Sequence, residues 1–564
     1  DSEPAPGDTV IDARGRTVIP GFNDAHAHSV WFGQTLREIN LGGARTRGDV
    51  LAALRTGSTG DWVVASGFNP NLLTDGPVPI ADFDHATAGK PLLIKHNSGH
   101  AYTVNSEALR RAGIDPANPP QIEGGEVVVD DTGNATGLLD ENAMRPINDV
   151  LQPESESNIT DALDRAGRHY LGEGITSVTD AGVAGGWIGH SPQEFGFYQR
   201  AREMGKLHVR TQAMITLDAL HGIDGHEGDP EVHGLDAGIR TGLGDDLLQI
   251  GPVKIFTDGS LLGKTAAMTE DYACCCHAGY FQGDTETMRS RALAAAAGGW
   301  SLALHAIGDK AVDFALDVIS EAVDKHGPRT VPHRIEHGGV VRNDQIERMA
   351  KTGVVLVPQP RFIAEFGDAM AEAIGAERAA LSYPAKRLLQ RGVVLPGSSD
   401  RPVATGTPLA VVQSFVERTT AAGKEYGPED RISADEALYA RILPELTGEA
   451  RFRPPRVRDM ATEWDVPETD IRRVLRMAAR QGRVDQIRQD HFFLRATTAE
   501  MVAIIAEVQA AAPDGWVTAA AFRDRVQNGR KVAIEILDFY DRQGVTLRRG
   551  DLRRINPHRA DLFG

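Results

Sequence analysis

The most constraining feature of this sequence is an alternation between short β-rich apolar runs and longer segments with helical periodicity. Each run ends in polar residues. The eight runs are residues 17–24, 174–180, 209–217, 250–257, 301–305, 333–337, 354–358 and 393–395. Strands that alternate with helices form parallel βα units. Eight such units are typical of a (β/α)8 barrel, so the sequence predicts an α/β, TIM-like fold.

The spacing of the runs also predicts an insertion and an extra N-terminal element. The gap between the first two runs is far longer than a normal crossover, so residues 45–160, rich in Gly, Pro and Asn, are expected to form an insertion in a barrel over residues 21–440. Residues 1–20 predict two short strands around Arg14-Gly15. Two strands alone do not form a stable sheet, so this segment is interpreted as a partial β-sandwich.

After about residue 440 the sequence changes character. The net charge of the whole chain is −18, yet residues 441–564 hold 22 Lys and Arg against 18 Asp and Glu. The triplet Arg480-Gln481-Gly482 recurs as Arg542-Gln543-Gly544, each time after an amphipathic helical pattern and before a β-like segment. This predicts two winged-helix domains, over residues 441–495 and 496–564. The basic tail, unlike the acidic part before it, has the charge to attract nucleic acid.

The three cysteines are consecutive, at Cys274, Cys275 and Cys276. Adjacent cysteines do not form a disulfide framework, so we interpret them as reduced thiols in a loop, with a soft-metal site as the alternative. Reduced thiols indicate a cytoplasmic protein. Apolar runs are too short to cross a membrane, which needs about 18 residues.

Candidate metal ligands stand at the ends of the apolar runs. His26 and His28 follow the first run, at the end of the first predicted strand, and alternate residues of a strand point to one side. They therefore form half of a metal site; two surface histidines are the alternative. Four further candidates are expected at the same mouth of the barrel: Lys254, His305, His337 and Asp400. The pattern His333-x-x-Glu336-His337 also fits an inverted zinc protease motif, although the surrounding residues favour a strand over the helix that this chemistry needs.

Motifs spread over residues 11–425 resemble those of the amidohydrolase superfamily, in the branch related to N-substituted formamide deformylases. The matching text includes PGFNDAHAHS, SGHAYTVNSEAL, GITSVTDAG, VKIFTDGSLLGKTA, LALHAIGDKAV, HRIEHGG and GSSDRPV. The resemblance implies that His26 and His28 hold one metal, and that a carboxylated Lys254 bridges to a second held by His305 and His337. It also implies that Asp400 binds metal and accepts the proton of the attacking water. Imidazole and anionic oxygen ligands suit Zn²⁺.

Two of these assignments leave structural alternatives open. Lys254 could form a structural ion pair inside the barrel, because an ammonium cannot ligate a cation. Asp400 could cap a helix, a role compatible with catalysis. The resemblance further implies that His100 and Asn105, in the insertion, close over the substrate; a solvated loop histidine is the alternative for His100.

Residues 441–564 resemble a different family, the C-terminal winged-helix repeats of the bacterial selenocysteine-specific elongation factor. The matching text is ARFRPPRVRDMA and DGWVTAAAFRDRVQNGRKVAIEILDFYDRQGVTLRRGDLRRI. In that family the last winged helix binds an RNA hairpin. The resemblance implies phosphate contacts from six residues: Arg530, Lys531, Arg548, Arg549, Arg553 and Arg554. The alternative is a solvated Arg-rich surface.

The sequence therefore predicts a metal-dependent hydrolase of a carbon–nitrogen bond, in a small amide or N-formyl substrate, followed by an RNA-binding-like tail. The rival hypothesis is an RNA-binding fragment of the elongation factor carried on an inactive barrel. No Pro/Gly/Ser-rich linker marks the join near residue 440, and the GTPase domains of the elongation factor are missing. We interpret the chain as a fusion of two gene fragments, either natural or the result of an error in sequence assembly.

Overall fold

The computed structural model describes residues 21–56, 61–96, 99–185, 188–229, 231–434, 436, 449–458, 468–480, 482, 484–559 and 562–563. They divide into two compact units. We call Phe22–Arg441 the N-terminal unit and the chain from Ile442 onward the C-terminal unit. The partial sandwich predicted for residues 1–20 lies outside the described residues.

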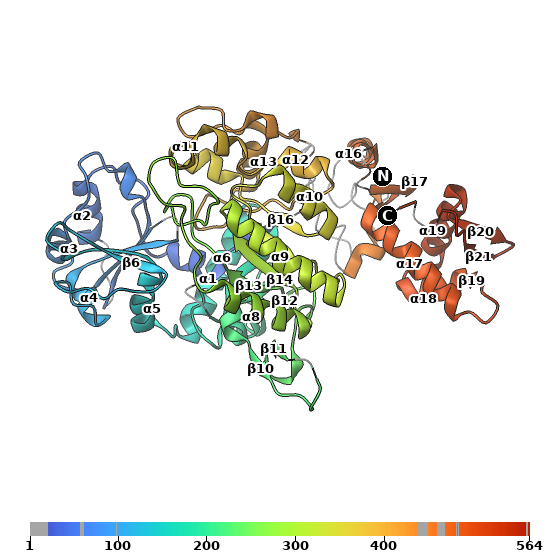
Figure 1. Cartoon of the computed structure of the whole chain (residues 1–564), viewed down its shortest axis with the longest axis horizontal. Coiled ribbons are helices and arrows are strands. Elements are labelled where there is room, and N and C mark those ends of the chain that lie inside the picture. Colours follow the sequence, from blue (N-terminus) through green and yellow to red (C-terminus); the bar gives the residue numbers. More distant parts are fainter. Residues whose placement is uncertain are drawn as a thin grey trace, which may run out of the picture. The chain divides into compact units, whose positions relative to one another are not determined.

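Two four-stranded parallel sheets form the centre of the N-terminal unit (Figure 1). The first has the order β1 (Phe22–Ala27), β8 (Ile175–Val183), β9 (Arg210–Ile215) and β12 (Leu248–Ile250). The second has the order β13 (Val253–Phe256), β14 (Leu302–Ala306), β15 (Arg334–His337) and β16 (Val355–Val357). An isolated parallel bridge between Thr216 and Lys254 joins the two sheets.

The eighth predicted strand, residues 393–395, does not form. Leu356 N of β16 donates to Val394 O at 3.2 Å, and Ala25 N of β1 donates to Gly397 O at 3.5 Å. One of these hydrogen bonds is made to β16 and the other to β1, so neither neighbour forms the repeated hydrogen bonds of a β-strand pair with this segment. The segment nevertheless runs between β16 and β1, which brings the chain that follows it beside β1.

Helices follow the strands and bury one apolar face each. They are α1 (Ser29–Thr35), α6 (Glu156–Gly172), α7 (Glu194–Glu203), α8 (Thr285–Ala297), α9 (Asp309–His326), α10 (Asn343–Thr352), α11 (Arg361–Ala380), α12 (Ala385–Gln390) and α13 (Pro408–Glu417). In α6, Ile159, Leu163, Ala166 and Tyr170 recur at helical spacing and are buried. Ser155 begins that helix by accepting the N–H of Asn158. Helix α9 packs on β14 between α8 and α10 (Figure 1), and a small hairpin, β10 (His221–Ile223) and β11 (Val232–Gly234), lies beside α8.

The segment expected as an insertion has a mixed sheet of its own, drawn in blue to cyan in Figure 1. Its order is β2 (Ile39–Asn40), β3 (Val63–Phe68), β4 (Leu92–His96), β5 (Ala101–Val104), β7 (Ala135–Glu141) and β6 (Gly125–Val129). Its helices are α2 (Arg47–Thr56), α3 (Ile80–Ala86), α4 (Ser106–Arg111) and α5 (Arg145–Leu151).

The C-terminal unit contains two helix–hairpin arrangements. In the first, α16 (Glu468–Arg480) precedes the antiparallel pair β17 (Val484–Arg488) and β18 (His491–Leu494). After α17 (Arg495–Ala511), the second has β19 (Val517–Thr518), α18 (Ala519–Val526), α19 (Arg530–Gln543), β20 (Thr546–Arg549) and β21 (Leu552–Ile555). Gly544 ends α19 with a φ of 75°, the left-handed conformation that glycine adopts easily. None of the helices described in either unit is long and apolar enough to cross a membrane.

Helices α1 and α6 cross closely at Gly33, which leaves no room for a larger side chain there. A Cβ on Gly33 of α1 would lie 2.0 Å from the carbonyl oxygen of Ala162 in α6, whereas one on Gly196 of α7 would meet nothing within 4 Å. Alanine favours a helix over glycine by about 1 kcal/mol, but overpacking costs about 1–3 kcal/mol. We expect Gly33→Ala to lower the midpoint of thermal unfolding and its matched control Gly196→Ala to leave it unchanged or raise it. Equal effects would contradict the close crossing.

Candidate active site

The predicted metal ligands converge at the carboxyl ends of the central strands. His26 lies in β1, with His28 directly after it; Lys254 is in β13, His305 in β14 and His337 at the end of β15. The ring centroids are 5.4 Å apart for His26 and His28, 4.8 Å for His26 and His337, and 4.4 Å for His305 and His337. All these side chains are buried.

Asp400 is fixed beside the first two histidines by backbone hydrogen bonds. Asp400 N donates to His26 O at 2.8 Å, and His28 N donates to Arg401 O at 2.9 Å. The Asp400 Oδ1 atom then lies 3.0 Å from His28 Nε2 and 3.3 Å from His26 Nε2. Asp400 and His337 have φ angles of 59° and 74°. Such conformations are unfavourable for residues other than glycine and gather at functional sites.

The atoms that would bind a metal have no hydrogen-bond partner among the described residues. They are His26 Nε2, Lys254 Nζ, His305 Nδ1 and Asp400 Oδ1, whereas His28 faces Asp400 through Nε2. Buried polar atoms are almost always paired, and an unpaired one calls for an explanation such as a bound ion. Candidate ligand atoms of His26, His337 and Asp400 lie within 4.8 Å of one another. The residues present therefore fit a cation.

Three acceptors fix the protonation of the imidazoles. His26 Nδ1 lies 2.5 Å from Glu336 Oε2, His337 Nδ1 lies 2.7 Å from Gln359 Oε1, and His305 Nε2 lies 3.1 Å from Gly259 O. A carboxylate, an amide oxygen and a carbonyl can only accept, so each of these nitrogens carries the proton. The opposite nitrogen of each ring keeps its lone pair, as metal ligation requires.

Sequence reasoning missed the role of Glu336 and did not consider Gln359. It treated Glu336 only as part of the His333-x-x-Glu336-His337 motif. Glu336 lies in a strand, where it accepts from Arg334 and faces His26. His333 turns elsewhere and accepts the N–H of Leu302. The protease interpretation is therefore wrong, because its two histidines do not share a helical face. The signal that could have identified Glu336 is its place two residues after Arg334 in a strand, because residues at that spacing share a face and these two carry opposite charges.

Burial and charge set the protonation of the acidic groups. Burial alone would raise the pKa of Asp400, but His26, His28 and His337 outweigh it and hold that pKa well below its usual range. Burial opposes ionisation of Glu336 as well, yet Arg334 and His26 keep its pKa low. Both carboxyls are thus charged at neutral pH.

Lys254 lacks the ion pair that was its structural alternative. Burial lowers its pKa to about 8, against the influence of Glu336 and Asp400. No salt bridge or hydrogen bond to Lys254 Nζ is found among the described residues, and the nitrogen lies 4.8 Å from the ring centroid of Phe256. A lysine with a lowered pKa has an appreciable neutral fraction, the form that can react with CO₂.

The two predicted substrate contacts differ in their surroundings. His100 lies 5.8 Å from the ring of His305, and its Nδ1 contacts Glu141 Oε2 at 2.9 Å. Asn105 instead begins α4: its Oδ1 accepts from Leu92 N and Ala108 N, and its Nδ2 donates to Thr87 and Lys90. The expectation that Asn105 closes over a substrate is therefore wrong, because these contacts occupy its amide.

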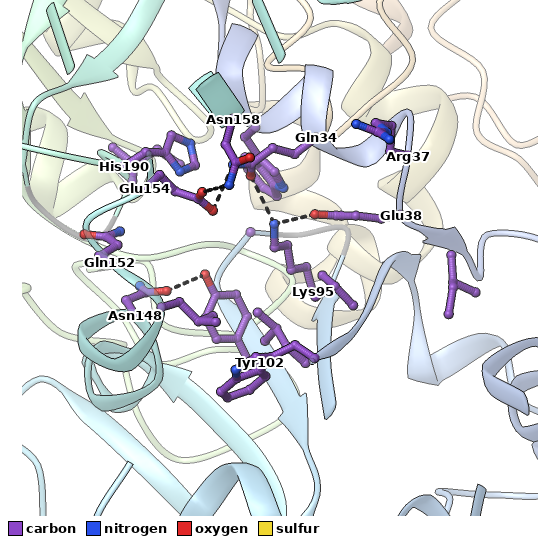
Figure 2. A pocket seen from close by; sticks show the side chains of 18 of the residues that line it. Gln34, Arg37, Glu38, Lys95, Tyr102, Asn148, Gln152, Glu154, Asn158 and His190 are labelled. Carbon is purple, nitrogen blue, oxygen red and sulfur yellow. Dashed lines mark hydrogen bonds and ion pairs between the residues drawn. The ribbon is translucent and has the colours of Figure 1, made fainter. Parts of the chain in front are cut away.

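Two hollows lie near the cluster. The smaller, about 30 Å³, is bordered by His100, His337 and Asp400 and by apolar side chains of α11, Phe362, Phe366 and Met370. The larger, about 500 Å³, lies between α1, α5, α6 and the inserted sheet. Figure 2 shows its polar lining, in which Lys95 contacts Glu38 at 2.7 Å and Tyr102 donates to Asn148. Trp31 lines the larger hollow, and its ring is 5.8 Å from that of His28.

Five of the six predicted phosphate-binding residues in the C-terminal unit are exposed. Arg530 and Lys531 begin α19, and Arg548, Arg549 and Arg554 lie on β20 and β21. Arg553 is different: it is 2% exposed and donates to Asp538 and Asp541. Its expected phosphate contact is wrong, because it faces the carboxylates of α19 inside the fold.

Comparison with known proteins separates the two parts of the chain. Residues 509–555 match the winged helix of elongation factor SelB. The selenocysteine-specific elongation factor of Escherichia coli K12 is 40% identical over 95 residues, which are 17% of this chain and 15% of that protein. The C-terminal unit thus resembles a small part of that factor.

The remainder of the chain has relatives along most of its length. The N-substituted formamide deformylase of Arthrobacter pascens is 29% identical over 448 residues, 77% of this chain and 80% of that protein. An uncharacterized metal-dependent hydrolase from Pyrococcus horikoshii has a crystal structure that covers 81% of this chain and 83% of its own, with 25% identity and a TM-score of 0.61. Residues 9–440 match the amidohydrolase family. Because this match spans well over half of the chain, the protein belongs to the amidohydrolase family.

Proposed function

We propose that the N-terminal unit is a metal-dependent hydrolase that cleaves a carbon–nitrogen bond in an amide or N-formyl group. Its scaffold would be a (β/α)8-type barrel in which residues 393–395 run between β16 and β1 without forming a regular strand. The observation that carries this proposal is the set of buried nitrogen and oxygen atoms of His26, Lys254, His305 and Asp400 that lack a hydrogen-bond partner among the described residues. Family membership and the similarity to N-substituted formamide deformylase support the same reaction class.

The ligand set favours zinc. Imidazole nitrogens and a carboxylate oxygen are its usual partners outside thiolate sites. His26, His28 and Asp400 would hold one ion, and His305 and His337 a second. Lys254 would bridge the two once carboxylated; its unpartnered Nζ and its pKa of about 8 support that reaction.

Asp400 acts as the proton carrier in this proposal. A bound divalent ion would polarise the substrate carbonyl and lower the pKa of a water to about 7. Asp400 is charged because the facing imidazoles hold its pKa low, so its carboxylate can accept the proton of the attacking water. It then returns that proton to the departing nitrogen, the general acid–base exchange that amide cleavage needs.

The side chains that line the small hollow beside the ligands favour an apolar group next to the bond that is cleaved. Phe362, Phe366 and Met370 of α11 face the hollow together with Leu261 and Val403. His100 borders the same space, and despite its burial Glu141 raises its pKa. A protonated His100 would donate a hydrogen bond to a substrate oxygen, while the apolar side chains would contact the neighbouring group of the substrate.

Metal analysis tests the ligand assignment. We expect the purified chain to hold about two divalent ions, and the double variant His26→Ala/His28→Ala to lose at least one of them. The matched control is His326→Ala at the exposed end of α9, which should keep the full content. Full metal content in a folded double variant would contradict the assignment.

Kinetics of Asp400→Asn test the proton carrier. Asparagine tolerates the positive φ of 59° at this position, so the backbone should be preserved while the base is lost. We expect kcat on an N-substituted formamide to fall about 10²–10⁴-fold. The control Asp236→Asn alters a side chain that is 94% exposed and should leave kcat unchanged. An unaltered kcat in Asp400→Asn would rule out this role.

A second function is proposed for the C-terminal unit: binding of an RNA hairpin. Its support is the match of residues 509–555 to a SelB winged helix together with exposed cations on α19, β20 and β21. Arg549 and Arg554 both lie over the ring of Trp516, at 6.0 and 5.1 Å, which leaves two positive charges side by side on the wing. A fusion of two gene fragments, as the sequence suggests, would leave the two functions independent.

Salt-dependent RNA binding tests this second function. We expect the full chain to bind a selenocysteine-insertion hairpin, with an affinity that falls as salt rises. Arg549→Gln/Arg554→Gln should weaken binding and reduce the log–log salt slope by about one per lost contact. Arg525→Gln on α18, already paired with Glu507 at 3.0 Å, is the control and should change neither. A salt slope that is the same in all three proteins would contradict the wing as the RNA contact.

A further inference from the structure

A second cluster of metal-binding side chains lies on the loop between β13 and α8. Cys274, Cys275 and Cys276 are followed directly by His277, and they are the three cysteines of the chain. Cys274 and Cys276 are exposed and Cys275 is half-buried. None of these residues belongs to the candidate active site, and the amide hydrolysis proposed above does not use them.

The loop holds these residues in a tight, anchored turn. Tyr272 N donates to His277 O at 2.8 Å, and Cys275 N donates to Tyr272 O at 3.3 Å. Tyr272 is buried and its hydroxyl donates to Ala266 O. On the other side, Ala273 N donates to Ala373 O of α11 at 2.8 Å. The backbone of the turn is therefore fixed before any ligand binds, which limits the entropy lost on coordination.

Two of the three ligand pairs already lie near the spacing that a tetrahedral ion requires, while Cys274 and His277 would have to approach each other on binding. Cys274 Sγ is 3.4 Å from Cys275 Sγ, and Cys275 Sγ is 3.3 Å from His277 Nε2. Zinc–sulfur and zinc–nitrogen bonds of about 2.3 and 2.0–2.1 Å place two tetrahedral ligand atoms roughly 3.5–3.8 Å apart. Small side-chain rotations would bring both pairs to that spacing. The 3.4 Å separation of the thiols also exceeds the roughly 2.05 Å of a disulfide bond.

We propose that this turn binds one thiophilic divalent cation of the zinc class through Cys274, Cys275 and His277, with Cys276 or water as the fourth ligand. Thiolate and imidazole ligands select such ions over magnesium or calcium. A thiol must lose its proton before its sulfur can bind a metal ion. Each sulfur–metal bond formed therefore releases one proton to solvent.

Cadmium titration of the reduced full-length chain tests the proposal. Thiolate-to-cadmium charge transfer gives an ultraviolet absorption band, and because every cysteine of the chain is in this turn, the band reports this site alone. We expect the band to saturate at one Cd²⁺ per chain, with about two protons released, and to be displaced by excess Zn²⁺. No band, or a band that does not saturate at this ratio, would overturn the proposal.

Variants distinguish this site from the histidine–aspartate cluster. Cys275→Ser should abolish the band, because Cys275 contacts both other ligands, and His277→Ala should weaken cadmium binding at least tenfold. The control His26→Ala/His28→Ala should retain the band unchanged even as its catalytic metal is lost. A band that survives in Cys275→Ser, or disappears in the control, would contradict a separate site.

A count of free thiols tests the alternative that two of the cysteines form a disulfide. Before titration, a thiol reagent should find three free thiols per chain after the reductant is removed under argon. A count of one would mean that two neighbouring cysteines have formed a disulfide, and the turn would then be a redox element instead of a cation site. Circular dichroism of Cys275→Ser should match that of the unmodified chain, so that loss of the band is not loss of the fold.

Discussion

The candidate active site depends on the hydrogen bonds that join β1 to the chain around Asp400. The two segments are far apart in sequence, yet Asp400 N donates to His26 O and His28 N donates to Arg401 O. Just before them, the Asp24 carboxylate accepts from Ser399 N and its hydroxyl. A shift of one residue in this pairing would turn alternate side chains to the other face. The histidine pair and the aspartate therefore meet only in this register.

Contacts of Arg401 also stabilise this pairing between β1 and the segment around Asp400. Arg401 is buried, donates to Glu173 at 2.7 Å and lies over the rings of Phe32 and Tyr170 at 4.8 and 5.2 Å. Separating the partners of a buried charge pair leaves a charge uncompensated. A shift that moved Arg401 away from Glu173 would therefore be unfavourable. The positive φ at Asp400 can persist because the surrounding hydrogen bonds leave that residue no alternative.

The sequence identified the convergent ligands because strand ends can be read from a pattern, while partners that meet across the fold cannot. His26, His305 and His337 each stand at the end of a predicted strand, and the structure brings them together. Gln359 follows β16 and contacts His337 through its side chain, a pairing without any local signature. The roles predicted for Asn105 and Arg553 were wrong for the complementary reason. Each residue carries a side chain suited to ligand binding, but capping contacts in one and two carboxylates in the other occupy it.

The two units have separate apolar cores, and this bears on how their functions could combine. Each has its own apolar core: one contains Trp300 and Ile335, the other Phe522 and Tyr540. Units with separate cores can in principle fold alone. The catalytic proposal uses residues of the N-terminal unit only, and the RNA proposal uses residues of the C-terminal unit only. Neither site needs a group from the other, so loss of one activity by substitution should leave the other intact, as expected for a fusion that joins two folded parts without coupling their chemistry.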